Sequence, residues 1–388
     1  MAVAWLDDVR STDLGTVGGK AASLGELTEA GLPVPPGFVV TAGTYRTFIE
    51  EAGIDEELFS AVDVDSEDSE ALETAHERAH ELIVETEVPE NVRAEIVEAY
   101  RSMGDGETFV AVRSSATAED LPDASFAGQQ ETFLNVTEDD LVDRVQECWA
   151  SLFSQRAIYY RNQKGFPHDE VDIAVVVQTM VDAEKSGVMF TSHPSTGDPR
   201  IIIEAAWGLG EAVVSGAVSP DNYVVDRTTG EVETMTVATK KLMHVKDEET
   251  GETVEREVPD DKRDQQVLTQ AEIDRLIELG KQVEDHYGEP QDVEWAVAGG
   301  EVYMLQSRPI TTIDDGADDS ADDADADADD DGDDHLLSGL GASPGITSGA
   351  VRIVTKLDHL DQVSEGDVIV TEMTMPDMVP AMKRAAGI

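Results

Sequence analysis

The chain has 388 residues and a formal net charge of −56, from 83 Asp and Glu against 27 Lys and Arg. This charge argues against nucleic acid and an anionic membrane surface as partners. Apolar residues make up 40% of the chain and fall in periodic blocks, which excludes disorder for most of it. We expect two or three domains from this length.

The acidity is spread along the chain. Residues 314–334 hold 13 Asp, and a large acidic excess remains without them. Such a surface is typical of proteins kept soluble in a salt-rich cytoplasm, where screening shortens the range of self-repulsion, so we interpret the chain as halophilic. Cys148 is the single cysteine, which excludes an intramolecular disulfide. No signal peptide or membrane span is recognisable, which favours a cytoplasmic location without a membrane partner.

The predicted elements mix helices and strands, which indicates an α+β class. The first helix starts after Gly18-Gly19, runs from Lys20 to Ala30 and has Gly31 at its C-cap. Helical patterns also cover residues 55–101, 140–164 and 270–287. Strands are predicted at 37–41, 109–112, 172–180, 186–191, 201–206, 222–226, 231–237, 292–298 and 301–306, and a Ser-rich loop is predicted at 113–128.

Three domains follow from this pattern: residues 1–312, an acidic linker at 313–335, and a third part at 336–388. The linker is rich in Asp, Ala and Gly, and it repels itself and cannot bury a core. Apolar patterning resumes after it and the chain ends at Ile388 on an apolar stretch, which we interpret as truncation.

Two motifs in the sequence match metal or nucleotide patterns poorly. His76-Glu-Arg-Ala-His80 fits the zinc-protease pattern, but it stands in a solvated acidic helix without a further histidine, so we expect a chance match. Residues 15–20 resemble a Walker loop, but Gly15 and Gly19 are too close together and Ala21 replaces the Ser or Thr that would hold Mg²⁺.

Four other segments together supply what phosphoryl transfer requires, namely cations for phosphate and oxygen ligands for Mg²⁺. In the first, Gly18-Gly19 lets the backbone approach an anion, and Lys20 opens a helix whose N-terminus attracts phosphate. The alternative is an ordinary surface lysine after a turn. In the second, Arg113 ends a strand before a hydroxyl-rich loop and suits a bidentate grip on phosphate. The alternative is a solvated loop with an Arg–Asp pair.

The third segment is a predicted hairpin. If residues 292–298 and 301–306 pair as antiparallel strands, Glu294 and Gln306 face the same side and form a plausible Mg²⁺ site, with Arg308 beside them for phosphate. The alternative is an edge hairpin with exposed polar residues.

The fourth segment, Gln178-Thr-Met180-Val181, closes an apolar strand. Its backbone could read an adenine edge while Met180 packs on the base. The alternative is a plain end of a core strand.

These residues together resemble the phosphoenolpyruvate synthase or dikinase family, which includes pyruvate phosphate dikinase and rifampicin phosphotransferase. The resemblance covers nearly the whole chain, through residues 18–27, 113–133, 204–211, 219–223, 292–309 and 341–387.

The resemblance implies an ATP-grasp fold for residues 1–312, with ATP and Mg²⁺ bound between two lobes. Lys20, Arg113 and Arg308 then correspond to catalytic phosphate ligands, and Glu294 and Gln306 to Mg²⁺ ligands. The ATP-binding residues so implied are Lys20, Arg113, Thr132, Gln178, Met180, Val181, Glu294, Gln306 and Arg308, with 178, 180 and 181 near the adenine.

In this family ATP phosphorylates a histidine on a swivelling domain, which passes the group to pyruvate in a C-terminal barrel. Residues 336–388 then correspond to the first part of the swivelling domain. The chain lacks both the family's Gly-Gly-x-Thr-x-His-Ala segment and the barrel, so pyruvate is expected as a partner only through that further part. A homodimer is a further expectation for the full-length form. Two alternatives stay open: a fragment of a rifampicin-type phosphotransferase, and a non-catalytic ATP-binding module.

Overall fold

The structure of the chain is a computed structural model. It describes residues 2–65, 68–104, 108–117, 120–121, 124–125, 131–194, 197–214, 216, 218–247, 250–310, 347–354, 362–371, 378–382 and 384–388. The chain divides into two compact units, Met1–Ile313 and Asp314–Ile388. The predicted linker at 313–335 lies outside the described residues.

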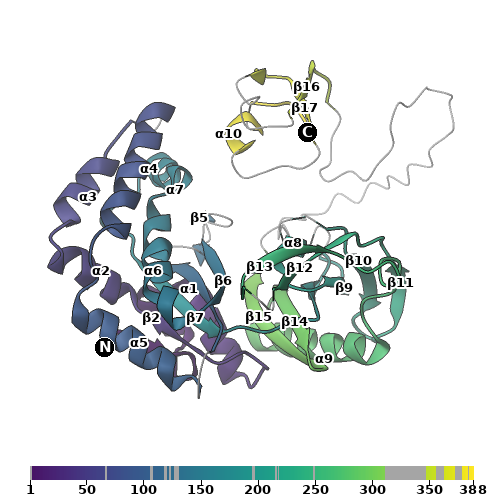
Figure 1. The fold of residues 1–388 in the computed structure, drawn as a ribbon. Helices are drawn as coiled ribbons and strands as arrows, with labels where there is room; N and C mark the ends of the chain where they lie inside the picture. Colours follow the sequence, from purple (N-terminus) through teal and green to yellow (C-terminus); the bar gives the residue numbers. More distant parts are fainter. Residues whose placement is uncertain are drawn as a thin grey trace. The chain divides into compact units, whose positions relative to one another are not determined.

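The first unit contains both helices and strands (Figure 1). Its helices are α1 (Leu14–Glu29), α2 (Ala42–Glu51), α3 (Asp55–Val62), α4 (Ser69–Val84), α5 (Glu90–Ser102), α6 (Glu138–Ala150), α7 (Gln155–Lys164), α8 (Glu211–Val214) and α9 (Gln270–Tyr287). Its strands are β1 (Val3–Trp5), β2 (Gly37–Val40), β3 (Val110–Ala116), β4 (Asp120–Leu121), β5 (Ala124–Ser125), β6 (Thr132–Val136), β7 (Ile173–Thr179), β8 (Lys185–Phe190), β9 (Arg200–Trp207), β10 (Asp221–Asp226), β11 (Val232–Thr236), β12 (Leu242–Lys246), β13 (Thr253–Glu257), β14 (Gln291–Ala298) and β15 (Glu301–Pro309).

The first lobe of this unit is built on an antiparallel sheet of order β1-β2-β7-β3-β6. Its central strand β7 is buried on both faces. Val175 and Val177 pack into a core shared with α2 to α7, whereas Ala174 and Val176 pack into a core shared with α1. The continuous apolar run of β7 follows from this double burial, because alternate side chains of a strand point to opposite faces.

The second lobe is built on an antiparallel sheet of order β11-β10-β9-β8-β14-β15, with α9 packed on it (Figure 1). Helix α9 has the predicted bounds, and its ends explain why. Thr269 and Glu272 form a capping box at the N-terminus, and Gly288 takes a left-handed conformation after the last turn.

Helix α1 packs on both lobes. Val17 and Leu24 belong to the core of the first lobe, whereas Leu27 belongs to the core of the second. Ser23 Oγ donates a hydrogen bond of 2.7 Å to the carbonyl oxygen of Ser307 in β15. The helix therefore connects the two sheets.

The structure confirms the mixed helix-and-sheet class and most predicted elements, with some differences. Residues 113–116 were predicted as loop, but they continue β3 because the whole of 110–116 pairs with β7. The helix predicted over 140–164 is interrupted by a 3-10 turn, Ser151–Phe153, after which Ser154 caps α7. The first helix begins earlier than predicted, at Leu14, with a break at Gly18.

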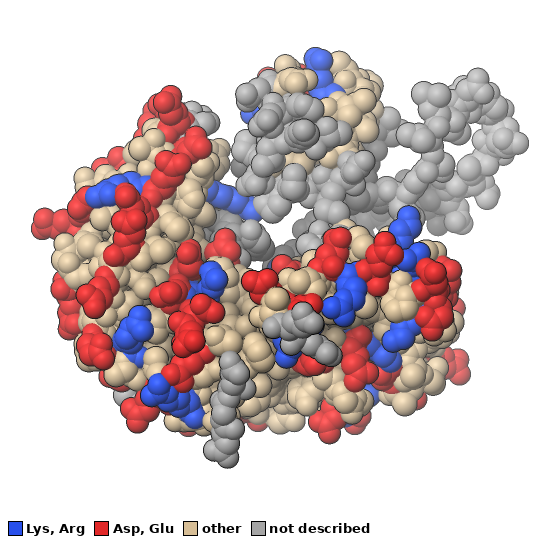
Figure 2. Space-filling model, viewed as in Figure 1, with Lys and Arg blue, Asp and Glu red and all other residues tan. Residues whose placement is uncertain are grey.

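Acidic side chains are distributed over the visible face of the first unit and outnumber the basic ones (Figure 2). Among the described residues, no helix is long and apolar enough to cross a membrane.

The second unit contains β16 (Val351–Ile353) and β17 (Val368–Val370), which pair in parallel, and α10 (Val379–Met382). A small cluster that includes Val354, Ile369 and Met378 forms its described core. That this unit is the first part of a swivelling domain stays a prediction.

Asp221 and Lys240 form a fully buried ion pair in the second lobe. Oδ1 of Asp221 accepts hydrogen bonds from Lys240 Nζ and from the backbone N–H of Ala238, and Oδ2 accepts from the backbone N–H of Val267 at 2.8 Å. The carboxylate thus joins β10 to the segments that follow β11 and precede α9. Removing one partner from such a pair leaves a buried charge without compensation.

We expect Asp221→Asn to lower the free energy of unfolding by about 3–5 kcal/mol. The matched change Glu233→Gln disrupts an exposed pair with Arg200 and should cost less than about 1 kcal/mol. Urea unfolding followed by tryptophan fluorescence measures both, because the four Trp residues of the chain all lie in the first unit. Equal losses in the two variants would contradict the structural role of Asp221.

Candidate functional site

The hairpin of β14 and β15 carries two pairs of polar side chains on one face. Glu294 lies directly opposite Gln306, and Asp292 directly opposite Arg308. Val293 and Trp295 alternate with them and are buried in the core of the second lobe. The predicted antiparallel pairing of 292–298 with 301–306 is therefore confirmed.

A β-bulge lies within this hairpin. Trp295 pairs with Met304 and Glu294 pairs with Gln306, so Leu305 is the extra residue of β15. Leu305 has no partner residue in the register with β14. Its carbonyl group accepts a hydrogen bond of 2.8 Å from Arg113 Nη1 of the first lobe.

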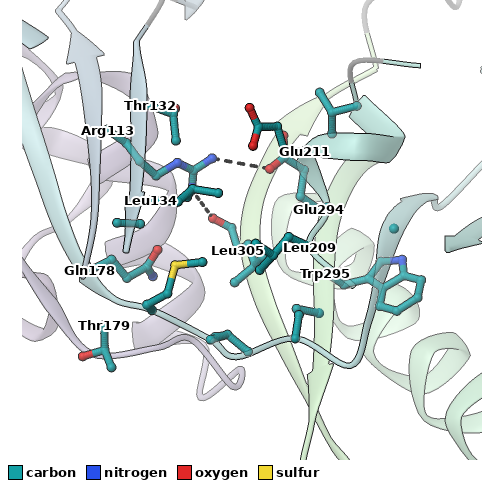
Figure 3. A pocket seen from close by; sticks show the side chains of 18 residues that line it. Arg113, Thr132, Leu134, Gln178, Thr179, Leu209, Glu211, Glu294, Trp295 and Leu305 are labelled. Atoms are coloured by element: carbon teal, nitrogen blue, oxygen red, sulfur yellow. Dashed lines mark hydrogen bonds and ion pairs between the residues drawn. The ribbon is translucent and has the colours of Figure 1, made fainter. Parts of the chain in front are cut away.

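Arg113 spans the space between the lobes (Figure 3). Its Nη2 donates to Gln306 Oε1 at 2.7 Å and lies 3.4 Å from Glu294 Oε2. Only 11% of the side chain is exposed, so these contacts are formed largely out of water. A planar guanidinium group with several donors suits such a set of oxygen acceptors.

Asp292 and Arg308 form the neighbouring pair, with Arg308 Nε and Nη2 both 2.8 Å from Asp292 Oδ2. Burial raises the pKa of Asp292 above its usual range, and the positive charge of Arg308 opposes that rise. About half of the Arg308 side chain is exposed. The hairpin therefore presents acidic, amide and basic groups in one row.

A cavity of about 290 Å³ lies between the two lobes beside Arg113. Six of the predicted site residues line it: Arg113, Thr132, Gln178, Met180, Val181 and Glu294. Lys20, Gln306 and Arg308 are not among its lining residues. Gln306 nevertheless reaches the cavity wall through its hydrogen bond to Arg113.

The segment Met180–Glu184 links the lobes at one end of the cavity. Strand β7 ends at Thr179, and β8 of the second lobe begins at Lys185. The backbone N–H of Met180 donates to Phe109 O, and that of Glu184 donates to Val297 O, each at 2.9 Å. Between these anchors, the backbone of Val181 has no hydrogen-bond partner among the described residues, and it lines the cavity.

The side-chain amide of Gln178 forms a hydrogen bond within the protein. Its Nε2 donates to Pro35 O at 3.1 Å, and the residue is almost fully buried. The side chain therefore lines the cavity and also anchors the segment before β2.

Lys20 follows a break in α1. Gly18 has φ 75° and ψ 171°, so a new helical segment starts after it, close to the predicted start of the first helix at Lys20 but within a helix that begins at Leu14. Lys20 Nζ donates to Ser114 O at 3.1 Å, which places its ammonium group at the carbonyl group of the residue after Arg113. The structure thus brings Arg113, Glu294 and Gln306 into direct contact and places Lys20 and Arg308 at adjoining positions.

The two histidines of the zinc-like motif on α4 make separate contacts. His76 Nδ1 lies 3.0 Å from Phe153 O, and His80 Nε2 lies 2.9 Å from Glu147 Oε2. The two rings have separate partners. In the part of the chain that the structure describes, no group of three His, Cys, Asp or Glu could hold a metal ion.

Comparison with known proteins assigns the family. Residues 14–329 match the family model described as "Pyruvate phosphate dikinase, AMP/ATP-binding domain". The chain belongs to the pyruvate phosphate dikinase AMP/ATP-binding domain family. The resemblance stated from the sequence motifs is thereby confirmed.

Three similar proteins from archaea are named as phosphoenolpyruvate synthases, two of them as probable ones. The chain is 51% identical to a "Probable phosphoenolpyruvate synthase" of Methanothermobacter thermautotrophicus, over all of this chain and 56% of the relative. It is 54% identical to a protein with the same name from Archaeoglobus fulgidus and 44% identical to the "Phosphoenolpyruvate synthase" of Pyrococcus furiosus, in both cases over all of this chain and 52% of the relative. The chain therefore spans about half the length of these relatives.

Among solved structures, a D-alanine–D-alanine ligase from Helicobacter pylori is 13% identical to this chain. The match covers 57% of this chain and 47% of the ligase, and its TM-score of 0.26 is too low to carry an argument about the fold.

Part of the cavity wall of this AMP/ATP-binding domain was missed by the sequence analysis. Leu209, Gly210, Glu211 and Val214 line the cavity from α8 and the two residues before it. The sequence analysis placed residues 204–211 only in the family resemblance. The glycine at 208 could have indicated a turn at this point, since its φ of 82° turns the chain from β9 toward α8.

A side chain at Gly18 would disturb both the backbone conformation and the packing beside the site. A Cβ atom there would lie 2.1 Å from the carbonyl oxygen of Ser115, in addition to the positive φ. We expect Gly18→Ala to lower the free energy of unfolding by about 2 kcal/mol or more.

The matched control is Gly15→Ala in the same helix. Gly15 has nothing within 4 Å of an added Cβ atom, so alanine should be neutral or stabilise by up to about 1 kcal/mol. Urea unfolding of both variants checks the pair. A stable Gly18→Ala protein would show that the break in α1 is not required.

Proposed function

We propose that this chain binds ATP in the cavity between its lobes and presents the triphosphate to the β14–β15 hairpin. The observation that carries the proposal is the position of the Arg113 guanidinium group, which contacts Leu305 O, Glu294 and Gln306 at the cavity wall. Two antiparallel sheets on either side of a nucleotide cavity also agree with an ATP-grasp fold, which the sequence resemblance implies. Membership of an AMP/ATP-binding domain family supports the same ligand.

The adenine base fits the linking segment. The cavity there is lined by Met180, Val181 and Ala183, which provide an apolar wall. The backbone of Val181 supplies polar groups that no described residue occupies, and such groups fix the orientation of a ligand in an apolar pocket. The triphosphate then extends toward Arg113 and Glu294, with Thr132 on the same wall.

The hairpin residues fit Mg²⁺. Glu294 and Gln306 face each other as a strand pair and both contact the same guanidinium group. A carboxylate and an amide oxygen are hard ligands, and Mg²⁺ is usually held by one or two protein carboxylates together with substrate phosphates. The absence of a three-ligand cluster among the described residues agrees with a metal that needs the nucleotide to complete its shell. A bound Mg²⁺ would supply charge neutralisation to the phosphates.

The relatives suggest the reaction of the whole protein. We infer that the chain is the nucleotide part of a phosphoenolpyruvate synthase. The family resemblance implies that such an enzyme converts ATP, pyruvate and water to AMP, phosphoenolpyruvate and phosphate. The histidine that carries the phosphoryl group and the pyruvate site would belong to the further half of such a protein. The acidic surface supports operation in a salt-rich cytoplasm.

Substitution of Arg113 tests the nucleotide site. We expect Arg113→Ala to weaken ATP binding by at least about tenfold, because the phosphates lose a cation and Glu294 keeps an uncompensated charge. Arg113→Lys should restore little of the lost ATP affinity, since an ammonium group cannot reproduce the planar set of donors of a guanidinium group. Arg200→Ala, at an exposed ion pair of β9, is the control. Isothermal calorimetry measures the affinities, and identical affinity in all four proteins would refute the site.

The metal role has its own test. Glu294→Gln should weaken ATP binding in the presence of Mg²⁺ but leave binding in EDTA unchanged or stronger, because it removes a ligand and a negative charge together. Calorimetry with and without Mg²⁺ gives both values. A variant that retains the full effect of Mg²⁺ on ATP affinity would remove Glu294 from the metal site.

A further inference from the structure

The hydroxyl group of Ser115 bonds to both sides of the break in α1. Ser115 lies on β3 and is fully buried. Its Oγ donates to Val17 O at 2.9 Å and accepts from the backbone N–H of Ala21 at 3.2 Å. Gly18, with its positive φ, stands between these two residues. One side chain from a distant strand therefore holds the chain where it leaves one helical segment and enters the next.

This arrangement supplies a cap that the helix cannot provide for itself. The segment that restarts at Gly19 has first-turn N–H groups without intrahelical acceptors. The residue before such a turn normally offers a Ser, Thr, Asp or Asn oxygen to them, but Gly18 has no side chain. Ser115 takes this part by accepting the N–H of Ala21, the third residue of the new segment.

The capped turn lies next to the proposed phosphate end of the cavity. Ser115 and Arg113 are two residues apart on β3, so they share a face of the strand at a spacing of about 7 Å. Lys20, inside the capped turn, reaches the carbonyl group of Ser114. The N–H groups of a helix start point along its axis, together with the positive end of the helix dipole.

We propose that Ser115 is a positioning residue for triphosphate binding. Its hydroxyl group fixes the turn Gly19–Ala21 against β3, and so it aims Lys20 and the start of the helix at the phosphates gripped by Arg113. This role rests on the proposed ATP site. Ser115 itself touches no nucleotide. From its buried position it fixes the geometry of the groups that bind the phosphates.

The experiment compares ATP with adenosine, which has the base and ribose but no phosphate. We expect Ser115→Ala to weaken ATP binding about tenfold while the affinity for adenosine changes less than twofold. Ser151→Ala is the matched control, because Ser151 is also buried and also donates one hydrogen bond, of 2.7 Å, to a backbone carbonyl, that of Cys148. It should leave both affinities unchanged. Ser115→Cys keeps a group of similar size with weaker hydrogen bonds and should fall between wild type and Ser115→Ala, which provides a milder variant if alanine impairs folding.

Isothermal calorimetry by direct titration with ATP, and by competition for adenosine, measures these values. An equal loss for ATP and adenosine would show a general disturbance of the cavity and overturn the inference, as would unchanged ATP affinity in both Ser115 variants. The proposed function fails separately, if the wild-type chain binds no ATP or if Arg113→Ala binds it as well as wild type. ATP binding that depends on Arg113 but not on Ser115 would leave the function standing and remove only the positioning role.

Discussion

The contact between Arg113 and the β14–β15 hairpin is the interaction on which the candidate site depends. It joins the central part of the first sheet to the edge of the second through one side chain, with acceptors on both strands of the hairpin. Because the guanidinium group is largely buried, its acceptors must be present and well placed, or its charge would be costly. The same requirement makes the group suitable for phosphate, which could take the place of one acceptor without leaving the cation unpaired.

Helix α1 is the second connection between the lobes. Its first part packs on β3 and β7, and its last turns pack in the core of the second lobe. The helix therefore carries Lys20 on a rigid element whose two ends are anchored in different sheets. A further contact comes from β13, where Thr253 Oγ1 accepts a hydrogen bond from Asn135 of β6 at 2.9 Å. The two lobes are thus joined by packed contacts at several points rather than by the linking segment alone.

The sequence predicted the elements of this site well and their three-dimensional relations only in part. Glu294 and Gln306 could be paired in advance because a hairpin with Gly299-Gly300 at its turn fixes which residues stand opposite each other. The end of β3 could not be predicted, since Ser114 and Ser115 look like loop residues until their buried hydrogen bonds to distant residues are known. Strands β12 and β13 were missed for a similar reason, because their half-buried residues show little hydrophobic alternation. Contacts such as that of Arg113 with Leu305 O depend on residues 192 positions apart, which no local pattern encodes.

The bulge at Leu305 has a consequence for how this hairpin can vary. Before the bulge, Val302 and Met304 of β15 point into the core, and after it Gln306 and Arg308 stand on the site face while Ser307 is buried. The extra residue thus inverts the inside–outside parity of the strand. Loss of the Leu305 codon would restore regular alternation and leave the amide and the guanidinium group on the site face, but it would remove the residue whose carbonyl group accepts a hydrogen bond from Arg113. The bulge residue therefore serves the contact between the lobes, and its loss should weaken that contact without exposing the core.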